Sequence, residues 1–388
     1  MAIQYDFDTI IDRHHTGAMK TDVLGERYGR EDLIPLWIAD MDFAVAPPIT
    51  EALVRRLQHP VYGYAEAPAS YWQSIIDWLK YLHGWEVKRE WITYIPGIVK
   101  GIGLAVNVFS NPGDKIIIQT PVYTPFMAVP GGNGQWNGTH YEMDFDHLES
   151  IIDPQCKILI LCNPHNPGGV VWPLATLQRV ADICARHHIL IIADEIHADM
   201  PIFGSKHHPF ASVSETAAQN SISFGAPSKT FNIAGLVSSY AIVPNETIRK
   251  RFFDWLTANE LNEPTFMATI ATEAAYNHCR DWREQMLAYV EQNILFVEEF
   301  LQQHIPQIKA IRPQASFIVW LDCTRLGLDH DALIDLFVDK ARPAPALNDG
   351  EMFGPEGKGH MRLNVGTPRA VLQKALEQLE EAVNHLDR

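Results

Sequence analysis

The sequence predicts an α/β protein with a mainly parallel sheet covered by helices on both faces, together with a smaller α+β domain. Between about residues 90 and 245, apolar runs that fit strands alternate with helical patterns. Strands without polar alternation are typical of parallel sheets that are buried on both sides. Beyond residue 245, long helical patterns dominate. The chain has 388 residues, too many for one core, so we expect two domains.

The first predicted elements are helical and follow an arm. Residues 1–45 form this arm, which is rich in Asp and contains Trp37. Pro47 and Pro48 then mark the start of a helix over 49–58, because proline fits the first turn of a helix. An aromatic, amphipathic pattern predicts a second helix over 70–83.

The middle of the chain alternates between strands and helices. Apolar runs bounded by glycine, proline or polar residues indicate buried strands, and an amphipathic run between two of them indicates a covering helix. The predicted strands cover residues 91–95, 115–119, 157–162, 189–193, 221–224 and 240–243, and the helix covers residues 174–188. Such alternation predicts a mainly parallel sheet with helices on its faces.

The last third of the chain mixes long helices with a strand. Helical patterns cover residues 246–257, 264–278, 280–304, about 330–340 and 368–385, a strand covers 316–321, and a Pro/Gly-rich loop covers 343–359. This mixture suits a smaller α+β domain. We therefore divide the chain into an arm over 1–45 that also forms part of the small domain, a large domain over 46–280, and a C-terminal small domain over 281–388.

The composition argues against several kinds of partner. A formal net charge of −16 disfavours nucleic acid and anionic membranes, because both require basic patches. The N-terminus shows no apolar signal segment, and the longest apolar runs, such as 189–193, are far too short to span a membrane. The five cysteines have no paired spacing and suggest buried thiols in a reducing cytosol. We expect a cytoplasmic protein without a metal site.

Polar side chains follow three of the predicted strands. Asn166 lies in an Asn-Pro-His-Asn-Pro-Gly-Gly stretch, Asp194 ends the next strand, and Lys229 follows the third. Because α/β sheets bind ligands outside the carboxyl ends of their strands, we expect these side chains to meet at one edge. Each also has a purely structural alternative: a double turn, a helix N-cap and a surface lysine.

Lys229 is the predicted centre of this site. It is the only charged residue of the glycine-punctuated stretch 223–235, which directly follows a predicted buried strand. We therefore expect its side chain near the core. Burial disfavours an ammonium ion and lowers its pKa, so that the neutral amine becomes available as a nucleophile.

These motifs resemble the fold-type-I pyridoxal-phosphate enzymes, the aspartate-aminotransferase superfamily. The resemblance rests on Asn-Pro-x-Asn-Pro-x-Gly, on a strand ending in Asp and on Ser-Lys-x-Phe, and it spans about Trp37 to Arg369. Within that superfamily, stretches 37–43, 194–197 and 228–232 resemble the MalY/PatB group of cystathionine β-lyases. The resemblance implies pyridoxal 5'-phosphate as cofactor and a large domain with a seven-stranded, mainly parallel sheet.

The resemblance also implies a role for each residue around the cofactor ring. Lys229 bonds to the cofactor aldehyde and then serves as the base at the substrate Cα. Asp194 faces the pyridine nitrogen and keeps it protonated, so that the ring accepts electrons. Asn166 donates to the phenolic oxygen, and Tyr123 stacks on the ring. His197 stands where many aminotransferases carry a tyrosine, a departure that fits the lyase group; a structural histidine is the alternative.

The phosphate group needs a cradle of donors. The resemblance places it on the backbone of Ile98 and Val99 at a helix N-terminus, with Ser228 adding a hydroxyl. Packing is the alternative reason for the glycines around this helix. Many aminotransferases have an arginine eight residues after the lysine, but this chain has Val237. Tyr64 resembles the tyrosine that reaches the phosphate of a neighbouring subunit, which implies a homodimer with composite active sites.

Arg362 resembles the arginine that grips the α-carboxylate of an amino-acid substrate. A guanidinium suits this task because it is a planar, two-pronged donor. Ala39 and Asn166 are expected to complete the carboxylate pocket. The alternative is an unpaired surface arginine.

The expected reaction is α,β-elimination from a sulfur amino acid such as cystathionine, giving pyruvate, ammonia and a thiol. Lys229 takes the Cα proton, and either Tyr123 or Lys229 protonates the leaving sulfur. Two alternatives stay open: an aminotransferase, and a regulatory protein that binds pyridoxal phosphate but acts through a protein contact.

Overall fold

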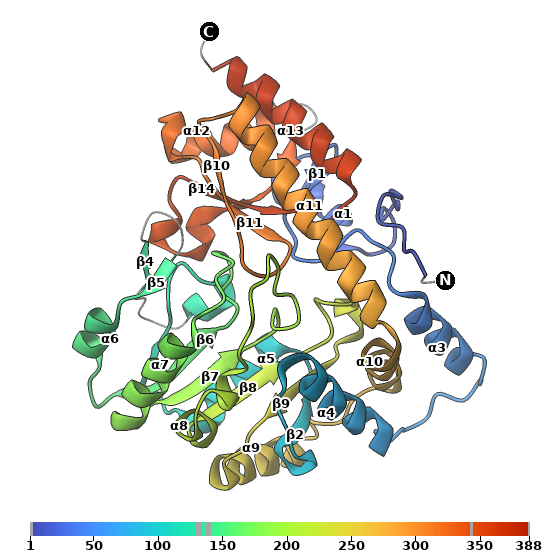
Figure 1. Cartoon of the computed structure of the whole chain (residues 1–388), viewed down its shortest axis with the longest axis vertical. Coiled ribbons are helices and arrows are strands. Elements are labelled where there is room, and N and C mark those ends of the chain that lie inside the picture. The colour runs from blue at the N-terminus through green and yellow to red at the C-terminus, as the bar shows by residue number, and fades with distance from the viewer. Residues whose placement is uncertain (1–2, 129–133, 137–140, 342–343, 387–388) are drawn as a thin grey trace.

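The computed structural model describes residues 3–128, 134–136, 141–341 and 344–386. It has two main sheets, a six-stranded sheet in the lower half of Figure 1 and a four-stranded sheet in the upper half. Helices lie around both sheets, which confirms the predicted α/β class. None of the helices in the described ranges is long and apolar enough to cross a bilayer.

The large sheet is mainly parallel, as predicted. Its strands, in spatial order, are β2 (Ile92–Ile95), β9 (Ser239–Ile242), β8 (Ser221–Gly225), β7 (Leu190–Asp194), β6 (Cys156–Cys162) and β3 (Lys115–Ile117). β9 runs antiparallel to both of its neighbours, β2 and β8, and the other neighbouring strands described in this sheet pair in parallel. Among the described residues the sheet has six strands, not the seven that the resemblance implied. The short strands β4 (Gly134–Trp136) and β5 (Tyr141–Met143) pair with each other instead of extending it.

Both faces of the large sheet are buried, which explains its uninterrupted apolar strands. On β6, Ile158 and Ile160 join the core beneath α5 (Ile98–Phe109) and α9 (Glu246–Ala258), while Leu159 and Leu161 face the opposite core. That second core includes Leu177 and other residues of α7 (Leu174–Arg186). This half of the molecule also contains α6 (Phe145–Ile151) and α8 (Glu215–Gln219).

Two glycines allow α5 to approach the sheet closely. Gly97, directly before the helix, has φ of +104°, a conformation that favours glycine. At Gly101, a Cβ atom would lie 2.4 Å from Cδ1 of Ile95 and 3.0 Å from the ring of Phe224. The glycine in mid-helix is therefore explained by close packing of α5 against the strands.

A group of helices covers the outer strands and leads to the small sheet. α10 (Phe266–His278) packs against α3 (Pro47–Leu57) and α4 (Ala69–His83), and Trp78 stacks on Tyr276 with ring centroids 4.8 Å apart. The 25-residue helix α11 (Arg280–His304) then runs along the side of the molecule from α10 towards the small sheet (Figure 1).

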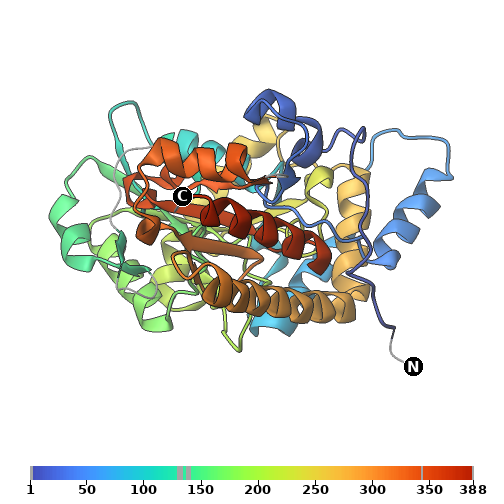
Figure 2. The same ribbon diagram turned by 90° about the horizontal axis from the view of Figure 1, so that it is seen from above.

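The small sheet is antiparallel. Its strands are, in order, β10 (Lys309–Ile311), β11 (Ile318–Asp322), β14 (His360–Asn364) and β13 (Asn348–Asp349). In Figure 2, α13 (Arg369–Asn384, dark red) lies beside the orange-brown α11, and these two helices are in contact. The N-terminal arm reaches this sheet region, because β1 (Ile34–Pro35) pairs with β12 (Pro345–Ala346). The arm also contains α1 (Met19–Asp22) and α2 (Leu24–Tyr28).

Two predictions for the last third need correction. The helix expected over 330–340 is α-helical only in α12 (His330–Asp335), and residues 336–340 form a π-helical turn. The stretch expected as a loop over 343–359 contains the short strands β12 and β13, whereas residue 343 lies outside the described ranges. The five cysteines are buried free thiols, which confirms the prediction from their spacing.

Candidate active site

The carboxyl ends of β6, β7 and β8 lie side by side. In the parallel register, Cys162 pairs with Asp194, and Asp194 pairs with Phe224. The Asn-Pro stretch, the acidic strand end and the lysine loop therefore leave the sheet at the same edge. The topology brings together the three segments on which the predicted site depends.

Lys229 lies in the irregular loop after β8. Two backbone hydrogen bonds close this loop, from Phe231 N–H to the Pro227 carbonyl and from Ile233 N–H to the Ser228 carbonyl, both 2.9 Å. The Lys229 ammonium is partly buried and donates to the carbonyl oxygen of Ala39. Burial lowers the pKa of Lys229 to about 8, although neighbouring carboxylates oppose the shift. A useful fraction of neutral amine is thus present near neutral pH.

Asp194 is the last residue of β7 and is only 4% exposed. Its Oδ1 accepts a hydrogen bond from Ile196 N–H at 3.0 Å. Burial raises the pKa of this carboxyl group to about 7, and the adjacent Glu195 adds to the shift, whereas Lys229 acts in the opposite direction. No regular helix starts here, so the N-cap alternative for Asp194 does not apply.

Arg362 is buried on β14 and makes three hydrogen bonds. One terminal nitrogen donates to Asn166 Oδ1 at 3.0 Å, and the other donates to the Trp37 carbonyl at 3.0 Å and to Asn348 Oδ1 at 2.5 Å. The guanidinium carbon lies 4.8 Å from the ring centroid of Phe353. Burial lowers the pKa of Arg362 to about 10, so the side chain stays charged at neutral pH. The surface-arginine alternative is therefore wrong.

His197 and Tyr123 are the remaining predicted side chains near the ring position. The imidazole of His197 is buried, and its Nδ1 has no hydrogen-bond partner among the described residues. Burial, together with the charges of Lys229 and Arg362, lowers the pKa of His197 to about 3, so the ring is neutral. Burial and the charge of Asp194 raise the pKa of Tyr123, which keeps its hydroxyl protonated.

The predicted phosphate cradle lies at the N-terminus of α5. Ile98 is buried and Val99 is exposed at the first turn, where helix N–H groups have no partner within the helix. Gly97 faces Val237, because a Cβ on Gly97 would lie 4.0 Å from Cγ1 of that side chain. The position at which many aminotransferases carry an arginine is therefore next to this helix end. Ser228 is buried in the lysine loop.

Tyr64 does not join the other predicted residues. It lies in the loop between α3 and α4, and its side chain is fully exposed. Contact between Tyr64 and the phosphate site of a neighbouring subunit stays a prediction.

Sequence reasoning missed Asn348 and the charged residues around the stretch Trp37–Phe43. Asn348 faces Arg362 across the ladder of β13 and β14, at a position predicted as loop. No short motif marks this asparagine. Asp40 and Asp42 belong to the stretch 37–43, which the sequence analysis singled out. Nothing in the sequence indicated that they pair with Arg13.

The arrangement fits a flat cofactor with an anionic group and a ring nitrogen. Two atoms of this site, His197 Nδ1 and Arg362 Nε, are among the buried polar atoms that have no hydrogen-bond partner in the described part of the chain. The carboxylate of Asp194 has a backbone N–H as its hydrogen-bond donor and a raised pKa, so a cationic ring nitrogen would stabilise its charged form. The residues present therefore suit pyridoxal phosphate and an amino-acid carboxylate.

Comparisons with known proteins agree with this geometry. The family model "Aminotransferase class I and II" matches residues 31–379. Cystathionine β-lyase PatB of Bacillus subtilis is 38% identical, with 98% of this chain and 100% of that protein covered, and protein MalY of Escherichia coli is 32% identical, with 98% and 99% covered. The crystal structure of cystalysin from Treponema denticola, which contains pyridoxal 5'-phosphate, matches with a TM-score of 0.94 at 34% identity, covering 99% of this chain and all of that one.

Proposed function

The chain belongs to the aminotransferase class I and II family, and we propose that it is a pyridoxal-phosphate-dependent carbon–sulfur β-lyase. The reaction is the α,β-elimination of a sulfur amino acid of the cystathionine type to pyruvate, ammonia and a thiol. Support comes from cystathionine β-lyase PatB and protein MalY, which align over nearly the whole chain, and from the site described above.

Lys229, Asp194 and Asn166 would hold the cofactor ring, with Tyr123 against its face and His197 near its edge. When bound, pyridoxal phosphate supplies an electron sink that stabilises negative charge at the substrate Cα. We assign the phosphate to the first turn of α5, through Ile98 and Val99, and to the hydroxyl of Ser228. Helix N-terminal N–H groups attract anions without a cationic side chain, which suits a site with valine at position 237.

Arg362, Asn166 and the backbone of Ala39 would bind the α-carboxylate of the substrate. The hydrogen bonds to Trp37, Asn348 and Asn166 fix the guanidinium plane in advance, so less side-chain freedom is lost when the carboxylate binds.

Lys229 would move the proton at Cα. Its lowered pKa allows a neutral amine near neutral pH, which is the form that accepts a proton. The protonated hydroxyl of Tyr123 and the Lys229 ammonium that results are both able to donate a proton to the departing sulfur. The observation that carries the proposal is that a partly buried amine and a buried carboxylate lie at one edge of the large sheet, where a buried guanidinium from β14 of the small sheet reaches Asn166.

An assay without any keto acid tests the proposed reaction. Purified protein with pyridoxal phosphate should release pyruvate and a free thiol from cystathionine, and Lys229→Ala should abolish this release. A reaction that stays silent until 2-oxoglutarate is added would identify an aminotransferase instead. If the wild type and Lys229→Ala are equally inactive in both assays, a regulatory role through protein contact becomes the better explanation.

We further propose that the active unit is a homodimer with composite sites in the cytoplasm. Exposed apolar side chains gather along the end of α3 and the loop after it, namely Val54, Leu57, Val61, Tyr62 and Tyr64. Such a patch favours association with another protein surface. The five buried free thiols suit a reducing compartment.

A further inference from the structure

The segment Trp37–Phe43 crosses the active site without regular secondary structure. Two of its carbonyl groups face the proposed catalytic and binding groups. The Trp37 carbonyl accepts a hydrogen bond from Arg362, and the Ala39 carbonyl accepts one from Lys229. The position of this short backbone segment therefore matters for both residues.

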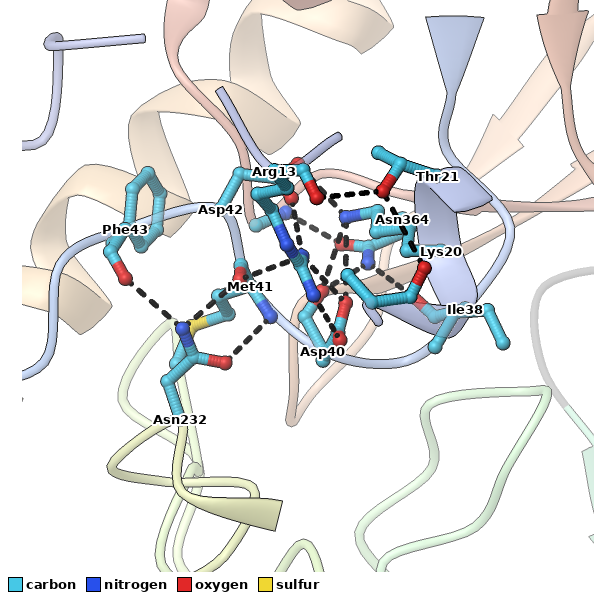
Figure 3. Close-up of polar contacts among 12 residues, drawn as sticks. Arg13, Lys20, Thr21, Ile38, Asp40, Met41, Asp42, Phe43, Asn232 and Asn364 are labelled. Carbon is cyan, nitrogen blue, oxygen red and sulfur yellow. Dashed lines mark hydrogen bonds and ion pairs between the residues drawn. The ribbon is translucent and has the colours of Figure 1, made fainter. Parts of the chain in front are cut away.

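Side chains from elsewhere in the chain hold most of the other carbonyls of this segment. Asn364 Nδ2 donates to the carbonyls of Ile38 at 2.5 Å and Asp40 at 2.6 Å. Asn232 Nδ2 donates to the carbonyls of Met41 and Phe43, both at 2.9 Å, while its Oδ1 accepts from Met41 N–H at 3.0 Å. Figure 3 shows these contacts reaching the segment from opposite sides.

A cluster of two cations and two carboxylates fixes the middle of the segment (Figure 3). Arg13 binds Asp40 with both terminal nitrogens, at 2.7 and 3.1 Å, and Asp42 at 2.7 Å. The fully buried ammonium of Lys20 lies 2.8 Å from Asp42 Oδ2 and 3.2 Å from the Asp40 carbonyl oxygen. A buried cation is stable only where opposite charge and hydrogen bonds compensate it. The four charges thus depend on one another.

The Arg13–Lys20 part of the arm also contacts the segment through its backbone. The indole N–H of Trp37 donates to the carbonyl of Lys20 at 3.0 Å. The arm is therefore attached to the segment at its first residue and again at both aspartates. Neither Arg13 nor Lys20 itself has a direct contact with Lys229 or Arg362 among the hydrogen bonds of the described residues.

We propose that Arg13 and Lys20 are positioning residues that act through Asp40 and Asp42. They hold the backbone of Trp37–Phe43 so that its carbonyls face Lys229 and Arg362, and so that the Ala39 backbone lines the carboxylate pocket. The functional meaning of this placement rests on the proposed lyase site, whereas the placement itself does not.

The test compares Arg13→Met with Arg30→Met in the protein loaded with pyridoxal phosphate. Arg30 is a matched control, because it also pairs with an aspartate (Asp32, 2.7 Å) and a backbone carbonyl, and its side chain is 20% exposed against 22% for Arg13. Amide hydrogen exchange over residues 37–43 should become at least about tenfold faster in Arg13→Met, because the variant loses three charge-assisted hydrogen bonds and the loss of one alone gives about this factor. Arg30→Met should leave exchange in this segment unchanged.

A kinetic measurement separates positioning from a merely structural role. Arg13→Met should raise the KM for the amino-acid substrate by more than it lowers kcat, because the carboxylate pocket is disturbed. Unchanged exchange over 37–43, or faster exchange with an unchanged KM, would overturn the proposal. Should Arg13→Met fail to fold, Arg13→Lys replaces it in the test. Exchange over residues 37–43 should then rise by a smaller factor, and no rise would contradict the proposal. Failure of the lyase assay with faster exchange would reject only the proposed function.

Discussion

At the scale of single residues, the carboxyl group of Asp194 makes the apoprotein sensitive to pH. Burial raises its pKa from the ordinary value of 3.8 to about 7 in the folded chain, because burial disfavours the charged form. Between these two values the folded protein binds a proton that the unfolded chain does not. The free energy of unfolding therefore falls as pH rises through this range.

We predict that Asp194→Asn stabilises the apoprotein at pH 8 but not at pH 4. At pH 8 the wild type holds a buried charge, whereas the amide keeps the hydrogen bond from Ile196 N–H without that charge. The free energy of unfolding should rise by an amount on the order of a few kcal/mol, as expected when burial moves a carboxyl pKa from 3.8 to about 7. Urea unfolding of cofactor-free protein at the two pH values measures it. An equal effect of the substitution at both values would contradict the argument.

Prediction at the level of single residues was possible where a motif links residue type to position in the fold. The sequence alone indicated that Asn166, Asp194 and Lys229 would approach one another, because each lies at the end of a strand of one sheet or shortly after it. It did not indicate Asn348, which reaches Arg362 through the pairing of β13 and β14. Such a contact depends on long-range strand register, for which a lone asparagine gives no local signal.

At the scale of elements, α5 links the phosphate cradle to the sheet. Its two interior glycines, Gly101 and Gly103, have different surroundings. A Cβ on Gly101 would meet Ile95 and Phe224, whereas a Cβ on Gly103 would have nothing within 4 Å. The packing of the helix therefore requires glycine at position 101 but not at position 103.

We predict opposite effects of alanine at these two glycines. Gly101→Ala should lower the free energy of unfolding by about 1–3 kcal/mol, because the added methyl overpacks the contact with β2 and β8. Gly103→Ala should raise it by up to about 1 kcal/mol, since alanine favours the helix. Thermal unfolding of both variants beside the wild type decides the matter, and a lower Tm for Gly103→Ala would show that the helix is not packed as described.

Most element boundaries followed from apolar runs and their end signals. The strands β6, β7 and β8 and the long helix α11 start or end within about one residue of their predicted limits. Short strands were harder to predict from the sequence. β12 and β13 have two residues each and are defined by their pairing with β1 and β14. Two residues are too few to show the alternation of apolar and polar side chains that predicts a strand.

At the scale of the whole molecule, two parts of the chain that are far apart in sequence meet, because β1 pairs with β12. We propose that residues 1–45 and 281–388 form one small domain and that 46–280 form the large one. The pairing of β1 with β12 supports the link, and α11 begins at the proposed boundary. Crystal structures with and without a substrate analogue would test it, since the two small-domain parts should superpose as one unit.

The proposed composite site makes a prediction for mixed dimers. If Tyr64 serves the neighbouring subunit, a hybrid of Tyr64→Ala and Lys229→Ala subunits has one site with both defects and one intact site. Lyase activity should therefore rise when the two inactive or weakened variants are unfolded and refolded together. No recovery, with hybrid formation verified by mass spectrometry, would mean that Tyr64 acts within its own chain or not at all.

The most direct test of the account is chemical labelling of the amine at position 229. Protein incubated with pyridoxal phosphate, reduced with borohydride and digested should carry the cofactor mass on the peptide that contains Lys229, and Lys229→Ala should lose this label. Such a result is expected because this amine combines a lowered pKa with a buried carboxylate nearby. A label on another lysine, or none, would contradict the assignment of this sheet edge as the active site.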